Sequence, residues 1–179
     1  MSRGLGDVYK RQIKYGCIKD AALFAKIAGY ADDAALLADI DSVVATCCAI
    51  KARIVEQDEF DTGLRMLLNF GHTLGHAVEQ HFGYSCFTHG EGVAIGMYQL
   101  TKRTEELGMT AKGSAERIKS VLEKYNLPLT AGVEKAQLLD TMARDKKKNG
   151  NSITLIILQQ IGEGVLQKVD WQEVPKYLG

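Results

Sequence analysis

The sequence predicts a mainly α-helical fold with a small β-strand or hairpin near the C-terminus. Only two prolines, Pro128 and Pro175, occur in its 179 residues, and proline is the residue that interrupts helices most strongly. Long segments rich in Ala, Leu, Lys and Glu favour helix. One run, residues 153–158, consists mostly of β-branched and aliphatic residues, which is typical of a strand. The length suits one well-buried core.

Helices are predicted from apolar periodicity and from residues that begin or end helices. They cover residues 13–28, 33–37, 43–58, 64–82, 90–107, 114–125 and 134–143. In the first half of the chain, Gly29 ends the first helix. Asp32 or Asp33 is expected to cap the second helix, and Asp41 or Ser42 the third.

Glycine, proline and short polar segments separate the later helices. Residues 59–63 are expected to form a loop before the helix at 64–82. Gly83 ends that helix and Gly108 ends the next one. The segment Asn126–Pro128 marks another break, because the residue before a proline disfavours helix. Asn149–Gly150 is a turn signal that precedes the strand.

Charge and composition exclude several classes of protein. The chain has 22 basic and 22 acidic residues, so it lacks the excess positive charge typical of nucleic-acid-binding proteins. No apolar run approaches the roughly 20 residues that span a bilayer, and the N-terminus lacks the apolar segment of a secretion signal. The four cysteines form no C-x-x-C pair and are expected to be reduced. We expect a cytoplasmic protein that binds neither nucleic acid nor membranes.

The most informative segment, residues 64–82, carries polar residues at a regular spacing. Its polar positions include Arg65, Asn69, His72, His76 and Glu79. Spacings of four, three, four and three residues place such side chains on one face of an α-helix. Because most of the residues between them are apolar or small, the rest of the helix is expected to be buried. The polar face is therefore predicted to line a cavity.

Histidines are concentrated in this part of the chain. All four lie between His72 and His89. His72 and His76 are four residues apart, so a helix brings both imidazoles to one metal ion or one substrate group. The cluster is interpreted as a metal- or substrate-binding site. The alternative is that each histidine is a hydrogen-bonded core or surface residue.

Two other residues of this segment have a functional and a structural interpretation. Arg65 on an apolar helix needs an anion, which is either a ligand carboxylate or phosphate or the nearby side chain of Glu59 or Asp61. Glu79 is either a ligand itself or a partner that orients His76.

Six motifs, taken together, resemble 3-dehydroquinate synthase in order and spacing. They are IKYG (13–16), KARIV (51–55), GLR (63–65), LNFGHTLGHAVE (68–79), HGE (89–91) and RDKK (144–147). The resemblance implies the helical C-terminal domain of the dehydroquinate synthase-like fold, which supplies the metal site and most substrate contacts. In that family NAD is bound mainly by an N-terminal Rossmann-like domain. No G-x-G-x-x-G motif follows a predicted strand here, so the chain is expected to be the second domain alone.

The resemblance implies a role for each matching residue. His72 and His89 match two metal ligands, and the metal implied is Zn²⁺ or Co²⁺. His76 matches a histidine that contacts substrate and takes part in proton transfer at its phosphate end. The implied substrate-binding residues are Lys14, Lys51, Arg65, Asn69, His76 and Lys146. Among them, Lys14, Arg65 and His76 are assigned catalytic roles.

One metal ligand of the family has no match. The family's third ligand is a glutamate three residues before the position of Lys14, and this chain has Arg11 there, followed by Gln12 in place of a valine. A guanidinium offers no lone pair to a cation. Residues 1–12 resemble nothing in the family and are interpreted as a non-native or truncated lead sequence. The metal- and substrate-binding domain is assigned to residues 13–179.

The resemblance also implies the reaction of the complete enzyme. It is a carbon–oxygen lyase of the shikimate pathway, which leads to chorismate and the aromatic amino acids. It converts 3-deoxy-arabino-heptulosonate 7-phosphate to 3-dehydroquinate and phosphate by transient oxidation with NAD, phosphate elimination, reduction and ring closure. The metal polarises the oxygen that is oxidised. The complete enzyme is expected to be a homodimer, and this chain alone is expected to be inactive.

Three other functions fit parts of the pattern. Another sugar-phosphate cyclase, such as an inosose or valiolone synthase, shares the fold and the metal site. An iron- or zinc-dependent polyol dehydrogenase has a similar histidine pair but needs no phosphate-binding lysines, so Lys14, Lys51 and Lys146 favour a cyclase. A metal-independent helical interaction module would use the histidines only structurally.

Overall fold

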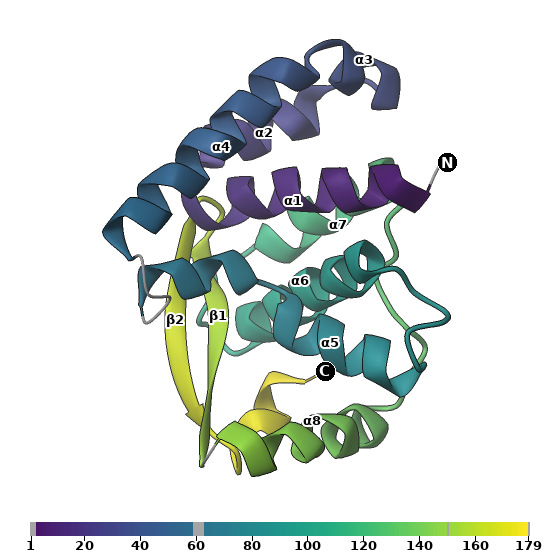
Figure 1. Ribbon diagram of the computed structural model, residues 1–179, viewed down its shortest axis with the longest axis vertical. Helices are drawn as coiled ribbons and strands as arrows, with labels where there is room; N and C mark the ends of the chain where they lie inside the picture. Colours follow the sequence, from purple (N-terminus) through teal and green to yellow (C-terminus); the bar gives the residue numbers. More distant parts are fainter. Residues whose placement is uncertain (1–2, 59–62, 150, 179) are drawn as a thin grey trace.

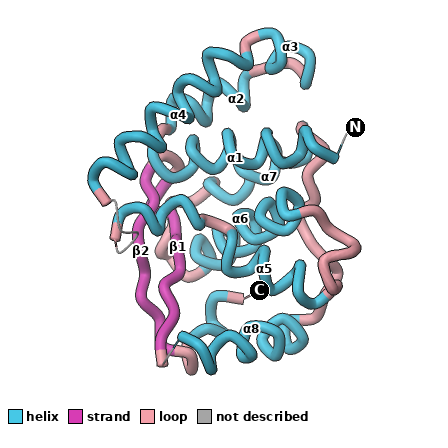
Figure 2. The backbone as a smooth tube through the Cα atoms, in the orientation of Figure 1, coloured by secondary structure: helices cyan, strands magenta, loops and turns pink. Residues whose placement is uncertain are grey.

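Helices make up most of the structure, and a β-hairpin runs along one edge of the helical body (Figures 1 and 2). This computed structural model describes residues 3–58, 63–149 and 151–178, with side chains described for 8–58, 63–143 and 151–178. The elements are α1 (Arg3–Lys19), α2 (Ala21–Gly29), α3 (Asp33–Ala38), α4 (Ile40–Gln57), the 3₁₀ helix η1 (Leu64–Asn69), α5 (His72–His81), α6 (His89–Glu106), α7 (Ser114–Lys124), α8 (Lys135–Asn149), β1 (Ser152–Gln160), β2 (Glu163–Asp170) and the 3₁₀ helix η2 (Val174–Tyr177). The predicted mainly α fold with a C-terminal hairpin is confirmed.

The first predicted helix is two helices. The chain breaks at Asp20, which has extended backbone angles and whose Oδ1 accepts a hydrogen bond of 2.8 Å from the Leu23 backbone N–H. An aspartate in this position satisfies one of the donors that a helix start leaves open. The expectation of one helix over residues 13–28 was therefore wrong, and α1 also begins earlier than predicted, at Arg3.

The predicted N-cap of α3 is confirmed, whereas the predicted N-cap of α4 is wrong. Asp32 caps α3 as predicted, because its Oδ1 accepts from the Ala35 backbone N–H at 2.9 Å. Helix α4 begins at Ile40, three residues before the predicted start, and its N-cap is Asp39 without a side-chain cap hydrogen bond. The expected caps at Asp41 or Ser42 were wrong, since both residues lie inside the helix.

The predicted helix over residues 64–82 is interrupted. The 3₁₀ helix η1 ends at Asn69, and Gly71 has a φ of 79° before α5 begins at His72. This left-handed conformation suits glycine. A Cβ on Gly71 would lie 2.6 Å from the Val93 carbonyl oxygen of α6. The prediction of one continuous polar helix face was therefore wrong, because packing against α6 turns the chain.

Helices α5 and α6 approach each other through glycines. A Cβ on Gly75 would lie 2.9 Å from the backbone of Gly92, and a Cβ on Gly96 would lie 2.0 Å from the Gly71 carbonyl oxygen. Any larger residue at these positions would force the helices apart. This close approach of the two backbones brings the start of α6 beside the polar side of α5.

Strand β1 separates two hydrophobic cores. It pairs antiparallel with β2, with Ser152 opposite Asp170 and Leu158 opposite Gly164. Successive side chains of a strand point to opposite faces. Ile156 and Leu158 accordingly pack in the larger core, which is built mainly from α1, α2, α4, α6 and α7, whereas Leu155 and Ile157 pack in the smaller core with residues of α5, α8 and η2.

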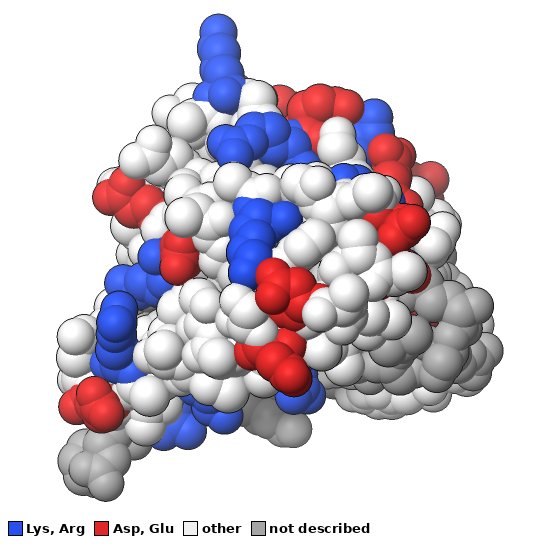
Figure 3. Space-filling view, turned by 90° about the horizontal axis from the view of Figure 1, so that it is seen from above, with Lys and Arg blue, Asp and Glu red and all other residues white. Residues whose placement is uncertain are grey.

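The face of the molecule drawn in Figure 3 is mixed in charge. On the face seen from above in Figure 3, basic and acidic side chains alternate and neither sign covers the face. Within the described residues, no helix combines the length and apolar character needed to cross a membrane.

The contact between α5 and α6 gives a first prediction. Gly96→Ala is expected to lower the free energy of unfolding by about 3 kcal/mol or more, because the new methyl group meets the Gly71 carbonyl. Urea denaturation followed by circular dichroism measures the change. The matched control is Gly29→Ala, since a Cβ on Gly29 meets nothing within 4 Å. A Gly96→Ala variant as stable as this control would contradict the packing described.

Candidate functional site

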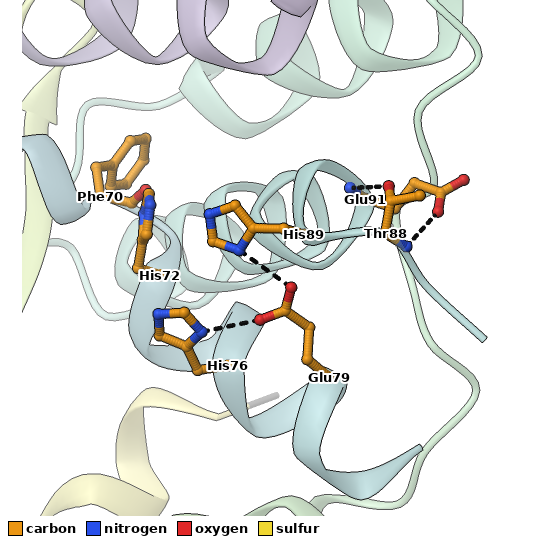
Figure 4. Close-up of polar contacts among 7 residues, drawn as sticks. All are labelled: Phe70, His72, His76, Glu79, Thr88, His89 and Glu91. Carbon is orange, nitrogen blue, oxygen red and sulfur yellow. Dashed lines mark hydrogen bonds and ion pairs between the residues drawn. The ribbon is translucent and has the colours of Figure 1, made fainter. Parts of the chain in front are cut away.

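Three histidines meet where α5 passes the start of α6 (Figure 4). His72 and His76 lie on α5, and His89 is the first residue of α6. A capping box fixes this helix start: the Thr88 hydroxyl accepts from the Glu91 backbone N–H at 3.3 Å, and the Thr88 N–H donates to the Glu91 carboxylate at 2.7 Å. Such reciprocal bonds stabilise the first helical turn. They hold His89 in place beside α5.

The three imidazole rings are spaced as ligands of one ion would be. The ring centres are 5.8 Å apart for His72 and His76, 5.1 Å for His72 and His89, and 5.5 Å for His76 and His89. Imidazoles that bind one zinc ion through nitrogen have ring centres about 5 Å apart. Figure 4 shows the rings surrounding a common space. The predicted cluster is therefore formed by His72, His76 and His89.

Glu79 forms hydrogen bonds with two of these histidines. The side chain of Glu79 is buried, and its two oxygens contact His76 Nδ1 at 2.8 Å and His89 Nδ1 at 3.0 Å. The predicted contact between Glu79 and His76 is confirmed. The contact with His89 was not predicted, because the two residues are ten positions apart and belong to different helices. Among the described residues, His76, Glu79 and His89 have donor atoms within 4.8 Å of one another.

His72 is held in its neutral form. Its Nδ1 donates to the Phe70 carbonyl oxygen at 3.2 Å. Burial and, to a lesser extent, the charge of nearby Lys14 together lower the pKa of His72 to about 3. Burial also lowers the pKa of His89, although the Glu79 carboxylate opposes this shift. Neutral imidazole is the form that binds metal ions.

Lys14 is a buried lysine beside this cluster. Its Nζ donates to the Leu68 carbonyl oxygen at 2.5 Å. Burial lowers the pKa of Lys14 to about 7, and the positive charges of Lys10, Arg11 and Lys51 add to the shift. Basic side chains gathered in this way form a favourable site for an anion.

The other predicted substrate-binding residues lie on elements other than α5 and α6. Lys51 is exposed on α4 and borders a hollow of about 410 Å³ together with Arg11 and Tyr15. Arg65 and Asn69 lie on η1 rather than on α5; Arg65 is half-buried and Asn69 is exposed. The shared α5 face predicted for them was therefore wrong.

Several predicted contacts fall outside what the structure describes. Lys146 lies on α8, but its side chain is not among the described ones. The expected partners of Arg65, namely Glu59 and Asp61, are likewise outside the described residues. The Arg65 backbone N–H itself donates to Asp58 Oδ2 at 2.9 Å.

Gln12 occupies a position that suits an apolar residue. It is buried on α1, and within the described part of the chain neither polar atom of its amide has a hydrogen-bond partner. A buried amide without partners costs about 1–3 kcal/mol. The environment therefore agrees with the valine that the resemblance places here.

A second hollow adjoins the histidines. It has a volume of about 390 Å³, and His76 lies in its wall with Thr73, Gln80, Thr154 and Trp171. His76 thus contributes both to the histidine cluster and to this pocket, which has polar and apolar walls. A small ligand in the pocket would contact the exposed edge of the His76 ring.

Two solved structures share the fold of this chain. One is ValA, a 2-epi-5-epi-valiolone synthase from Streptomyces hygroscopicus with NAD⁺ and Zn²⁺ bound, with a TM-score of 0.79 and 21% identity over 98% of this chain and 50% of that one. Another is 2-deoxy-scyllo-inosose synthase complexed with carbaglucose-6-phosphate, NAD⁺ and Co²⁺, with a TM-score of 0.77 and 17% identity over 97% of this chain and 51% of that one. The fold is that of the dehydroquinate synthase-like cyclases.

Sequence similarity is more specific. Residues 9–148 match the family described as 3-dehydroquinate synthase C-terminal, and the chain belongs to this family. The family predicted from the six motifs is confirmed. The match begins at residue 9, so residues 9–12 do resemble the family, contrary to the expectation for residues 1–12.

Curated relatives agree with this assignment. The 3-dehydroquinate synthase of Clostridium acetobutylicum is 46% identical over 176 residues, which are 98% of this chain and 48% of the relative. That of Enterococcus faecalis is 36% identical over 167 residues, which are 93% of this chain and 47% of the relative. The chain spans about half the length of the curated relatives it matches.

The buried ammonium of Lys14 gives a second prediction. Its pKa falls from 10.5 to about 7 on folding, so between these pH values the unfolded chain binds a proton that the folded chain does not. The free energy of unfolding should therefore rise with pH in this window, by at most about 1.4 kcal/mol per pH unit. Lys14→Met removes this contribution, so the wild type should gain stability relative to the variant from about pH 7 to pH 10.

Urea denaturation at several pH values, with a chelator present, measures this difference. The control is Lys19→Met, which replaces an exposed lysine of the same helix. It should leave the pH dependence of the wild type unchanged. Equal pH dependences for the wild type and Lys14→Met would show that Lys14 is protonated in the folded chain throughout.

Proposed function

We propose that this chain is the metal- and substrate-binding domain of a 3-dehydroquinate synthase. The complete protein would convert 3-deoxy-arabino-heptulosonate 7-phosphate to 3-dehydroquinate and phosphate, with NAD held by a preceding domain. The observation that carries the proposal is the meeting of His72, His76 and His89 beside buried Lys14, all at motif positions of the family. A cytoplasmic homodimer of the shikimate pathway is the form expected for the complete enzyme.

The donor set fits a divalent metal ion. His72 is neutral near pH 7, and its Nδ1 is bonded to Phe70, as the Nδ1 of His89 is bonded to Glu79. Each ring therefore keeps its Nε2 lone pair for an ion. We assign His72 and His89 as the ligands of Zn²⁺ or Co²⁺. When bound, the ion would supply Lewis acidity at the hydroxyl that is oxidised.

The cationic residues suit a phosphorylated sugar acid. Lys14, Lys51, Arg65 and Lys146 would hold the substrate carboxylate and phosphate, and Asn69 would hydrogen-bond a hydroxyl. His76, whose ring is exposed to the neighbouring pocket, would contact the phosphate end and transfer a proton there. Lys14, Arg65 and His76 are the residues proposed to take part in catalysis.

A different cyclase is the main alternative. The valiolone and inosose synthases share the fold, but at 21% and 17% identity, whereas curated 3-dehydroquinate synthases reach 46%. Sequence similarity therefore favours 3-dehydroquinate as the product. Turnover of the two substrate types by the full-length protein would separate the alternatives. A metal-independent module is disfavoured by the meeting of three histidines beside buried Lys14. A polyol dehydrogenase is disfavoured by the presence of Lys14, Lys51 and Lys146.

Metal binding is the third prediction. The chain should bind Co²⁺, and the double change His72→Ala with His89→Ala should weaken binding by more than about 100-fold, since loss of even an outer-shell partner costs about 10–100-fold. Isothermal titration calorimetry and cobalt absorption spectra measure it. The matched control is His81→Ala, which removes an exposed histidine at the end of α5.

The missing glutamate allows a complementary test. Arg11→Glu should tighten Co²⁺ binding, because it replaces a cation near Lys14 with a carboxylate, whereas Lys19→Glu makes the same charge change at the far end of α1. Absence of Co²⁺ binding in the wild type and in Arg11→Glu would favour the metal-independent module.

The activity of the isolated chain is the fourth prediction. A purified polypeptide of these 179 residues, supplied with NAD, Co²⁺ and substrate, is expected to form no 3-dehydroquinate, because its sequence has no dinucleotide-binding glycine motif. Ultraviolet detection of the product measures it. The full-length Clostridium acetobutylicum relative is the positive control. Product formation above background would contradict this expectation.

A further inference from the structure

Glu79 contacts two histidines at once. Its Oε2 lies 2.8 Å from His76 Nδ1 and its Oε1 lies 3.0 Å from His89 Nδ1 (Figure 4). One histidine comes from the same helix and the other from α6. The carboxylate of Glu79 therefore connects His76 of α5 to His89 of α6.

The packing of α5 on α6 creates the space for this carboxylate. A Cβ on Gly92 would lie 3.2 Å from Glu79 Cγ and 3.1 Å from the Gly75 carbonyl oxygen. Without a side chain at Gly92, the Glu79 side chain passes beneath the first turn of α6 and reaches His89. The glycines therefore allow both the close approach of the two helices and the position of the Glu79 carboxylate.

The exposure of the three side chains indicates what Glu79 does. The side chains of His76 and His89 are 54% and 40% exposed, whereas that of Glu79 is 5% exposed. An incoming ion or substrate meets the ring edges first, and the carboxylate lies behind them. This is the arrangement in which a carboxylate orients a histidine rather than binding the ion itself.

Hydrogen-bond chemistry then fixes both rings. An ionised carboxylate only accepts hydrogen bonds. Both His76 and His89 must therefore carry a proton on Nδ1, and whenever either ring is neutral its lone pair is on Nε2. Neither ring can change its tautomer without losing its bond to Glu79.

We infer that Glu79 is the positioning residue that holds His76 and His89 in the same tautomer. It thereby couples His89, the proposed metal ligand, to His76, the proposed substrate-contacting histidine. The roles of the two histidines rest on the proposed function, whereas the tautomer lock does not. One carboxylate serving both rings means that displacement of either ring strains the bond to the other.

Glutamine cannot replace Glu79 in this role. Its amide has the same shape, but only one oxygen accepts, and the NH₂ group donates. In Glu79→Gln one of the two rings faces this NH₂ group and must shift its proton from Nδ1 to Nε2 to accept the bond. The substitution therefore changes a tautomer and not only a contact.

Two-bond ¹H–¹⁵N correlation spectra of the metal-free chain test the inference, at about pH 8 where an ordinary histidine is neutral. In the wild type, His76 and His89 should both show the Nδ1–H pattern. In Glu79→Gln one of them should change to Nε2–H, while His72, bonded to Phe70, should stay unchanged. The control is Glu116→Gln, an exposed glutamate of α7, which should change no histidine.

The wild-type spectrum alone is decisive if Glu79→Gln fails to fold. An Nε2–H tautomer for either His76 or His89 in the wild type overturns the inference, as does an unchanged histidine spectrum in a folded Glu79→Gln. These spectra need no metal and no substrate. They therefore test the role of Glu79 even if the proposed function is wrong.

Zinc addition separates positioning from direct ligation. If Glu79 positions the rings, Zn²⁺ should attach to His89 Nε2 and the Nδ1 proton of His89 should remain visible. Glu79→Gln should then weaken Co²⁺ binding by about 10–100-fold. Loss of the Nδ1 proton on zinc addition, with ¹⁵N shifts that mark Nδ1 as the bound atom, would show Glu79 and the two Nδ1 atoms acting as ligands and overturn the inference.

Discussion

The direct contact between the backbones of α5 and α6 is the constraint on which the site depends. The histidines come from both helices, and glycines at positions 75, 92 and 96 leave no side chains between them. A side chain at Gly92 would meet the Glu79 side chain, since a Cβ there would lie 3.2 Å from Glu79 Cγ. The same contact turns the chain at Gly71 and so separates η1 from α5. Packing, local backbone conformation and the arrangement of polar groups therefore have one common cause.

The fold class and the histidine cluster could be predicted from the sequence, whereas the contacts between separate helices could not. Helix propensity and one β-rich run sufficed for the fold class, and the histidine motifs identified the cluster. The polar periodicity at residues 65–79 predicted one helix, because spacing alone does not reveal that Gly71 adopts a positive φ against α6. The Asp20 cap was missed for a similar reason, since apolar periodicity continues across it. The Glu79–His89 bond joins separate helices, and no local pattern signals it.

Charge balance around the histidines favours an anion beside a cation. Lys14 is buried with other cations near it, and it lowers the pKa of His72. A metal ion alone would add positive charge to an already positive region. An anionic ligand placed between the lysines and the ion would offset both charges, as expected of low-dielectric sites. An ion at the histidines would therefore be bound more tightly when a negatively charged ligand lies beside the lysines.

The position of β1 between the two cores has a consequence for folding. Ile156 and Leu158 face one core and Leu155 and Ile157 face the other, so a shift of pairing by one residue would exchange the two sets. Neither core can close correctly until the hairpin has its register. The two cores are therefore expected to form in a single cooperative transition, because one strand supplies a wall to each.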